Sequence, residues 1–111
     1  MNLLPNYENA SIPIEKFTKY ALDPDKEPNK AEAFELALGY NQTNAVKLIA
    51  NIRRNLPKFP AVSKGNKGYG MTYEVVMNLI GENDKTAKVK TGWVEDSANT
   101  EIRLVTAFVD K

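Results

Sequence analysis

The sequence contains no cysteine and no histidine. Without cysteine the chain has no disulfide bonds, no thiolate nucleophile and none of the common zinc sites, which depend on thiolate ligands. Without histidine it lacks the usual general base of enzymes and the usual ligand of softer metals. An enzyme built on this chain would have to use lysine, arginine, tyrosine, threonine, serine and carboxylate side chains.

Long apolar segments are also missing. No apolar run approaches the roughly 18 residues that a transmembrane helix needs. The first residues lack both the basic start and the long apolar stretch of a signal peptide. We therefore expect no membrane partner. A length of 111 residues, with 42% apolar and 26% charged residues, predicts one folded domain over residues 1–111.

Charge is balanced in total but not along the chain. The net charge is +1, yet residues 47–90 contain nine Lys or Arg and only three Asp or Glu. Residues 1–46 contain four basic and seven acidic side chains, and residues 91–111 are also slightly acidic. The central block is therefore the region that we expect to face a polyanion.

The apolar pattern has a helical period in the first half of the chain and an alternating period in the second. Helices are expected at residues 13–22, 29–38 and 42–56. A loop rich in glycine, proline and lysine follows at 57–71, and strands are expected at 73–80, 87–94 and 101–109. Short turns between strands indicate an antiparallel meander. The predicted fold class is α+β, with three N-terminal helices followed by an antiparallel sheet of three or four strands.

Lys30 is the first candidate functional residue. It lies in the first turn of the second expected helix, where the helix dipole disfavours a cation by a few tenths to about 1 kcal/mol. It also borders the apolar stripe that contains Phe34 and Ala37. Breaks of local rules concentrate at functional sites. The alternative is a lysine whose methylene groups cover the edge of the core while its ammonium group stays in water.

Arg103 is the second candidate, because it interrupts an apolar strand with a charge that is rarely buried unpaired. It either faces water or meets an anion. One pairing across the turn at residues 96–99 places Arg103 opposite Trp93, on the face that also carries Thr91. A shift of one residue places Trp93 in the core instead. Thr106 lies on the other face from Arg103 in a regular strand, unless a bulge intervenes.

Basic side chains of the central block form a third candidate group. They surround a glycine-containing loop and a hairpin, with an aromatic residue between them, as a nucleic-acid surface requires. The alternative is a set of separately solvated lysines. The candidates for substrate binding are Lys64, Lys67, Tyr69, Lys88 and Lys90, with Trp93 on the neighbouring strand.

Short motifs are spread over nearly the whole chain. They are Ile12–Lys16, Tyr20–Leu22, Lys30–Ala31 with Phe34, Leu38–Tyr40, Tyr69–Gly70, Trp93 and Arg103–Ala107. In these motifs the sequence resembles a set of bacterial domains found at the C-termini of polymorphic toxins and of phage head-morphogenesis (minor capsid) proteins. Two segments depart from that pattern: the loop at 23–29 is acidic and rich in proline, and residues 81–84 replace a tighter turn.

The resemblance implies a fold and an activity. Such toxin modules are grouped with the barnase–EndoU–colicin–Rel type of ribonuclease, in which N-terminal helices precede an antiparallel sheet that cuts RNA. It implies metal-independent cleavage of RNA, tRNA included, by attack of the ribose 2′-OH on the adjacent phosphate, without a cofactor. Arg103 would stabilise charge on the phosphate, and Lys30 would neutralise it or transfer a proton. Thr91 or Thr106 would hold an oxygen, and Trp93 or Tyr69 would stack a base.

The resemblance also implies a biological setting. The domain would be the C-terminal module of a longer protein, would act in the bacterial cytoplasm of the producer or the target cell, and would have a cognate immunity protein as its partner. The rival expectation is a non-enzymatic phage or adaptor module that binds a protein or nucleic acid through its basic central face. Binding without turnover distinguishes that module from a ribonuclease.

Overall fold

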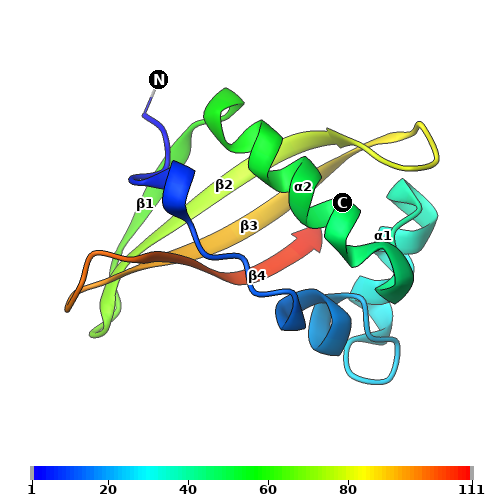
Figure 1. Cartoon of the computed structure of the whole chain (residues 1–111), viewed down its shortest axis with the longest axis horizontal. Coiled ribbons are helices and arrows are strands. Elements are labelled where there is room, and N and C mark those ends of the chain that lie inside the picture. The colour runs from blue at the N-terminus through cyan, green and yellow to red at the C-terminus, as the bar shows by residue number, and fades with distance from the viewer. Residues whose placement is uncertain (1, 111) are drawn as a thin grey trace.

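The computed structural model describes residues 2–110, and an α+β fold with an antiparallel four-stranded sheet is confirmed. Within those residues two α-helices form, α1 (Pro28–Leu38) and α2 (Ala45–Asn55). The strands follow as β1 (Ala61–Asn66), β2 (Gly70–Ile80), β3 (Thr86–Asp96) and β4 (Ile102–Val109), in that order across the sheet (Figure 1). Shorter helical turns lie at Tyr7–Asn9, Phe17–Ala21, Gln42–Asn44 and Leu56–Lys58.

Two of the expected elements differ from the structure. The helix expected at 13–22 is one π-helical turn, Phe17–Ala21, closed by the Leu22 amide donating to the Phe17 carbonyl at 2.8 Å. The expected loop at 57–71 contains β1 and the start of β2. Its composition is typical of a loop, but pairing with β2 supplies its backbone hydrogen bonds. A register shift between Ser63 and Gly65 accommodates the glycine at φ 90°.

Helix α1 begins and ends where its sequence favours it. Pro28 occupies the first turn, where its fixed φ suits a helix and its missing N–H costs nothing. Gly39 ends the helix in the left-handed conformation at φ 74°, and its amide donates to the Glu35 carbonyl at 3.0 Å. The β2–β3 hairpin packs on this end, because the Glu82 amide donates to the Leu38 carbonyl at 2.8 Å.

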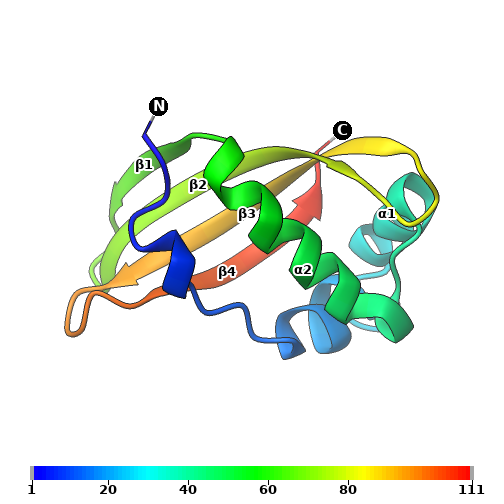
Figure 2. The same cartoon turned by 45° about the horizontal axis from the view of Figure 1, so that its top comes forward.

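The core lies between one face of the sheet and the helical layer. In both views α2 crosses this face of the sheet, and α1 lies near the end of β4 (Figures 1 and 2). A buried Asn51 ties α2 to the sheet, since its side-chain amide donates to the Tyr40 hydroxyl and to the Ile80 carbonyl, each at 2.9 Å. The largest fully buried side chains are Trp93, Tyr40, Phe17, Phe34, Leu4, Leu22, Leu38, Leu48, Ile52, Leu56, Met77 and Leu79.

The β3–β4 register contains a one-residue bulge that decides which side chains face outward. Gly92 is opposite Thr106 and Trp93 is opposite Leu104, so Val105 has no partner on β3. Side chains alternate along a strand, and an extra residue reverses the alternation beyond it. Ile102, Leu104 and Ala107 are therefore buried, while Arg103, Thr106 and Phe108 point to the other face.

The N-terminal segment covers part of the outer edge of β4. Ser11 pairs with Arg103 in a parallel bridge: its amide donates to the Ile102 carbonyl at 2.8 Å, and its carbonyl accepts from Leu104 at 2.9 Å. Pairing of this kind protects an edge strand from adding another chain. Beyond the bulge, β4 is flanked instead by residues 16–21 and by α1. No helix within residues 2–110 is long and apolar enough to cross a membrane.

Candidate nucleic-acid interface

The sheet face turned away from the helices carries most of the predicted site. We call it the open face, and it contains the outward side chains of all four strands. Three rows cross it from β4 to β2: Arg103–Val94–Thr72, Thr106–Gly92–Glu74 and Phe108–Lys90–Val76. Lys88 lies in the next row on β3, opposite Asn78, and is exposed.

Of the two registers that the sequence left open, the structure has the one that places Trp93 in the core, so Thr91 and Trp93 do not share a face with Arg103. Arg103 lies opposite Val94, one residue away from the register that would have placed Arg103, Thr91 and Trp93 on one face of the sheet. Thr91 and Trp93 are 0% and 1% exposed on the core side. The Thr91 hydroxyl donates to the Val75 carbonyl and accepts from the Trp93 indole N–H, each at 2.8 Å. Both side chains are thus buried and hydrogen-bonded to each other, so neither can contact a substrate.

Lys30 and Thr106, in contrast, come together at the edge of β4. They line a depression of about 150 Å³ between the strand and the segment that leads into α1. We call this depression the β4-edge site. Thr106 reaches it because the bulge, the one exception that the sequence left open, turns its side chain to the face of Arg103. The remaining lining residues are Lys16, Tyr20, Ala21, Glu27, Val105 and Ala107.

The β4-edge site contains charged side chains of both signs, and they form no ion pairs with one another. Lys16, Lys30 and Glu27 all line it, and none of them forms an ion pair within 4.0 Å among residues 2–110. The Lys16 ammonium group lies instead 5.9 Å from the centre of the Tyr20 ring. Each of the three charges is only partly exposed, so an anion entering the site would meet two cations and one carboxylate.

Two further cations of the open face already have carboxylate neighbours. The Arg103 guanidinium lies 3.7 Å from Asp96, and the Lys90 ammonium group lies 3.9 Å from Glu74. The side chains of the Arg103 pair are 48% and 33% exposed, and exposed pairs of this kind contribute about 0–1 kcal/mol. Their carboxylates can therefore be exchanged for a phosphate at little cost in stability.

Arg103 is not part of the β4-edge site. It does not line this depression: it lies opposite Val94 while Thr106 lies opposite Gly92, one row away and about 7 Å along the sheet. It belongs to the end of the sheet where the β1–β2 and β3–β4 hairpins lie side by side (Figures 1 and 2). There the Ser97 hydroxyl donates to the Tyr69 carbonyl at 3.5 Å. Tyr69, Lys64 and Lys67 are exposed at this end, away from Lys30.

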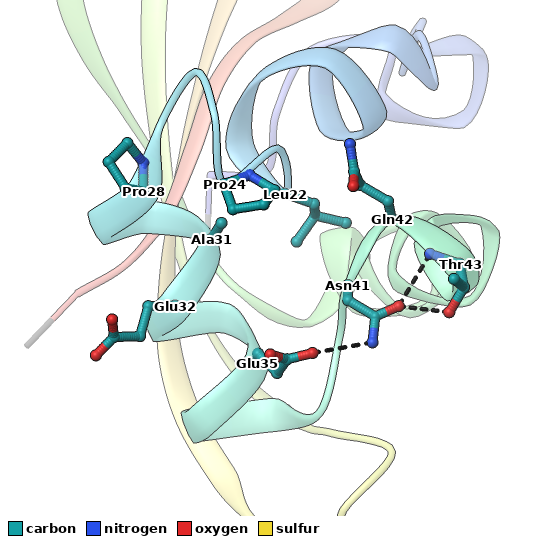
Figure 3. Close-up of a pocket in the computed structure, with 9 residues that line it drawn as sticks. All are labelled: Leu22, Pro24, Pro28, Ala31, Glu32, Glu35, Asn41, Gln42 and Thr43. Atoms are coloured by element: carbon teal, nitrogen blue, oxygen red, sulfur yellow. Dashed lines mark hydrogen bonds between the residues drawn. The ribbon is translucent and has the colours of Figure 1, made fainter.

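A larger hollow, of about 450 Å³, lies on the other side of α1 (Figure 3). It contains none of the predicted site residues. Its polar groups bind one another: the Asn41 amide donates to Glu35 at 3.0 Å, and the Asn41 oxygen accepts from the Thr43 amide at 2.9 Å. These bonds cap the helical turn that leads into α2. We therefore assign this hollow a structural role.

Tyr73 shows the clearest perturbation of a titratable group. It lies on the core side of β2, beside a hollow formed with Asn2, Leu3 and Pro5. Burial raises the pKa of its phenol above the ordinary value, and the negative charge of Glu95 raises this pKa further. Both causes favour the neutral phenol. Tyr73 is on the opposite side of the sheet from the β4-edge site.

Several residues of the site could not be identified from the sequence. Glu27 was grouped with the acidic, proline-containing loop at 23–29, yet it lines the β4-edge site just before Pro28. Tyr20 was recognised only as part of the motif Tyr20–Leu22, and Phe108 only as part of the expected strand at 101–109. The one local signal was Lys30 in the first turn of α1. Within residues 2–110 no three carboxylates are grouped so as to hold a metal ion.

The fold and the site define a small α+β domain with one helix-covered sheet face, one open face carrying cations, and a mixed-charge site at the edge of the last strand. Residues 3–111 match the family described as a domain of unknown function, DUF6883, and the chain belongs to that family. No curated protein matches the chain, and no solved structure matches it either.

Proposed function

We propose that this domain is a metal-independent ribonuclease that binds single-stranded RNA across its open face and cleaves it at the β4-edge site. The observation that supports the proposal best is the meeting of Lys30, Glu27 and Thr106 in one depression. Glu27 and Lys30 lie three residues apart at the start of α1, and β4 brings the distant Thr106 to them, so that a cation, a carboxylate and a hydroxyl are combined. These are the groups that phosphate transfer needs when histidine is absent.

The chemistry divides among these three residues. The ribose 2′-oxygen attacks the adjacent phosphorus while the bond to the 5′-oxygen breaks, leaving a 2′,3′-cyclic phosphate and a free 5′-hydroxyl. Glu27 accepts the proton of the 2′-OH. Lys30 stabilises the negative charge that builds up on the phosphate oxygens and supplies the proton to the leaving 5′-oxygen. Thr106 donates a hydrogen bond that orients the phosphate.

Arg103 takes a different part in this proposal from the one that the sequence suggested. Arg103 does not line the β4-edge site, and its guanidinium lies beside Asp96, so in this proposal it does not bind the reacting phosphate together with Lys30. It binds a neighbouring phosphate instead, and Lys88 and Lys90 extend the cationic surface across β3. Contacts of this kind position the strand without reading its sequence. Loss of Arg103 should therefore weaken binding more than it slows the bond-breaking step.

The test uses purified protein and a single-stranded RNA in excess EDTA, with products resolved on a gel. The wild type should give a 2′,3′-cyclic phosphate end, and a 2′-deoxy substitution at the cleaved position should block the reaction. Lys30→Gln and Glu27→Gln should each slow cleavage about 100-fold or more. Lys26→Gln is the matched control, because Lys26 is an exposed cation of the loop that leads into α1 and does not line the β4-edge site. Uncut RNA, or equal rates for Lys30→Gln and Lys26→Gln, would refute the proposal.

The carboxylate next to Arg103 offers an independent check of the binding surface. Asp96→Asn removes the anion that competes with a phosphate for this guanidinium. It should therefore tighten RNA binding several-fold at low salt and change the free energy of unfolding by no more than about 0.5 kcal/mol. Weaker binding by this variant would show that Arg103 does not face the RNA.

A toxin role follows from the resemblance to C-terminal domains of polymorphic toxins. In that role the enzyme acts in the bacterial cytoplasm, on tRNA or other RNA, and an immunity protein covers the open face. Expression in bacteria should then arrest growth and fragment cellular RNA, and the Lys30→Gln variant should do neither. Survival with intact RNA would exclude this role.

The second candidate is a non-enzymatic module that binds a protein or nucleic acid. Exposed apolar side chains on the open face favour it, since Val62 and Ile80 are 54% and 65% exposed there. Binding to the open face without any cleavage, unchanged by Glu27→Gln, is the outcome that would replace the ribonuclease by this module.

A further inference from the structure

Phe108 is an aromatic ring in an unusual position. It points to the open face from β4, one alternate position beyond Thr106, and is only partly buried. It is not among the apolar residues that pack on the core, whereas the neighbouring Val109 is. An aromatic ring that leaves the core of a small domain gives up apolar burial, and it needs another partner.

Two ammonium groups approach this ring from different elements. Lys30 Nζ, from α1, lies 5.6 Å from the ring centre, and Lys90 Nζ, from β3, lies 5.8 Å from it. Lys90 is the cross-strand partner of Phe108. Ammonium groups at this distance interact favourably with the ring. Glu74 lies 3.9 Å from the Lys90 ammonium group, whereas Lys30 forms no ion pair within 4.0 Å among residues 2–110.

There is also space beside the ring. A second depression, of about 180 Å³, is lined by Asn29, Lys30, Ala33, Phe108 and Val109. Lys30 lines both this depression and the β4-edge site. A planar group resting on Phe108 would thus lie directly next to the place where the phosphate is proposed to react. An aromatic ring with flanking cations is the combination that single-stranded nucleic acids require.

We propose that Phe108 is a nucleobase-stacking residue, with Lys30 and Lys90 binding the phosphates on either side of the stacked nucleotide. The inference rests on RNA being the ligand of the open face, and it deepens the proposed function by naming the base subsite. It assigns to Phe108 the role that the sequence analysis gave to Trp93 or Tyr69. Because every base has an aromatic face, the subsite should hold any of the four.

The test replaces Phe108 by a fluorescent ring. In Phe108→Trp the new indole stacks on a base and its emission is quenched. Trp93 is buried and gives a constant background emission, which is measured on the wild-type protein. The probe is a 2′-O-methyl RNA oligonucleotide of twelve or so residues, which the enzyme cannot cleave because the attacking hydroxyl is blocked. The comparison probe is an abasic oligonucleotide with the same phosphates. Tyr69→Trp, on an exposed hairpin, is the matched control variant.

We expect the base-containing probe to quench Phe108→Trp strongly, the abasic probe to leave it unchanged, and Tyr69→Trp to respond weakly to both. Phe108→Leu should bind the base-containing probe about 5- to 150-fold more weakly and the abasic probe with wild-type affinity. Its thermal unfolding should stay close to that of the wild type, since the ring is outside the core.

The outcomes separate this inference from the proposed cleavage. If the base-containing probe quenches Phe108→Trp but the wild type never cuts RNA, the cleavage is disproved and the base subsite is supported. RNA cleavage without quenching, equal quenching by both probes, or wild-type affinity of Phe108→Leu would each overturn the base subsite and leave the cleavage proposal standing. Failure of the wild type to bind either probe would overturn both.

Discussion

Thr91→Val is the substitution that best separates a structural from a catalytic role. It keeps the shape of the side chain and removes only the hydroxyl, which is fully buried. That hydroxyl is the acceptor for the indole N–H of Trp93, which is itself 1% exposed. The substitution therefore leaves a buried donor without a partner, and an unsatisfied buried donor costs about 1–3 kcal/mol.

The net change is smaller than that penalty because the new methyl group is apolar and buried. Such a group offsets roughly 0.8 kcal/mol, so a loss of about 0.2–2 kcal/mol in the free energy of unfolding is expected. With a urea slope of about 2 kcal/mol per molar, the unfolding midpoint falls by about 0.1–1 M at an unchanged slope. Trp93 emission reports both the unfolding and the loss of its hydrogen bond.

Thr106→Val is the matched partner of this experiment. Its hydroxyl is partly exposed in the β4-edge site, so stability should change by no more than about 0.5 kcal/mol while RNA cleavage falls. Thr91→Val should do the opposite and retain its cleavage rate where it is folded. A Thr91→Val protein of wild-type stability that no longer cuts RNA would refute the assignment of Thr91 to the core.

Two further predictions concern stability alone. Because burial and Glu95 raise the pKa of Tyr73 in the folded state, the folded protein holds this proton more tightly than the unfolded chain does. Stability contributed by Tyr73 is thus present below pH 10 and is lost as the pH rises above it, and in urea titrations Tyr73→Phe should flatten that alkaline loss. Gly81→Ala places a methyl group 2.2 Å from the Leu38 carbonyl oxygen and should lower the free energy of unfolding by about 1–3 kcal/mol or more. In Gly65→Ala the methyl group meets nothing within 4 Å, so only backbone strain of about 1 kcal/mol is expected. Equal unfolding midpoints for the two glycine variants would contradict this packing.

The elements that depend on local signals could be predicted from the sequence. The end of α1 at Gly39 follows from one residue that adopts positive φ readily, and the core side of α2 follows from apolar residues at helical spacing. Each of these signals is carried by residues close together in the chain. The π-helical turn at Phe17–Ala21 and strand β1 were not predictable in the same way, because their backbone pairing is not encoded by a distinct local pattern.

The candidate site depends on register and on contacts between distant segments, and this is where prediction from the sequence failed. Lys30 was identified because it breaks a local rule at a helix start. The face of Thr91 and Trp93 could not be decided, because a shift of one residue moves the side chains of a whole strand to the other face of the sheet. Glu27 was not identified because its acidic neighbours resemble a solvated loop, and it is the packing of the start of α1 near β4 that brings Glu27 and Lys30 to Thr106.

The bulge at Val105 joins the fold to the proposed function. Without it, strict alternation would bury Thr106 and Phe108 with Ile102 and Leu104. The bulge buries Ala107 in their place and turns the hydroxyl and the ring outward. Keeping the Thr106 hydroxyl out of the core avoids a desolvation cost. Full burial of the Phe108 ring would contribute about 1.5–3 kcal/mol to stability, and the partly exposed ring gives up a share of this. Core packing therefore does not explain why Phe108 faces outward, whereas a ligand that stacks on the ring beside Lys30 does.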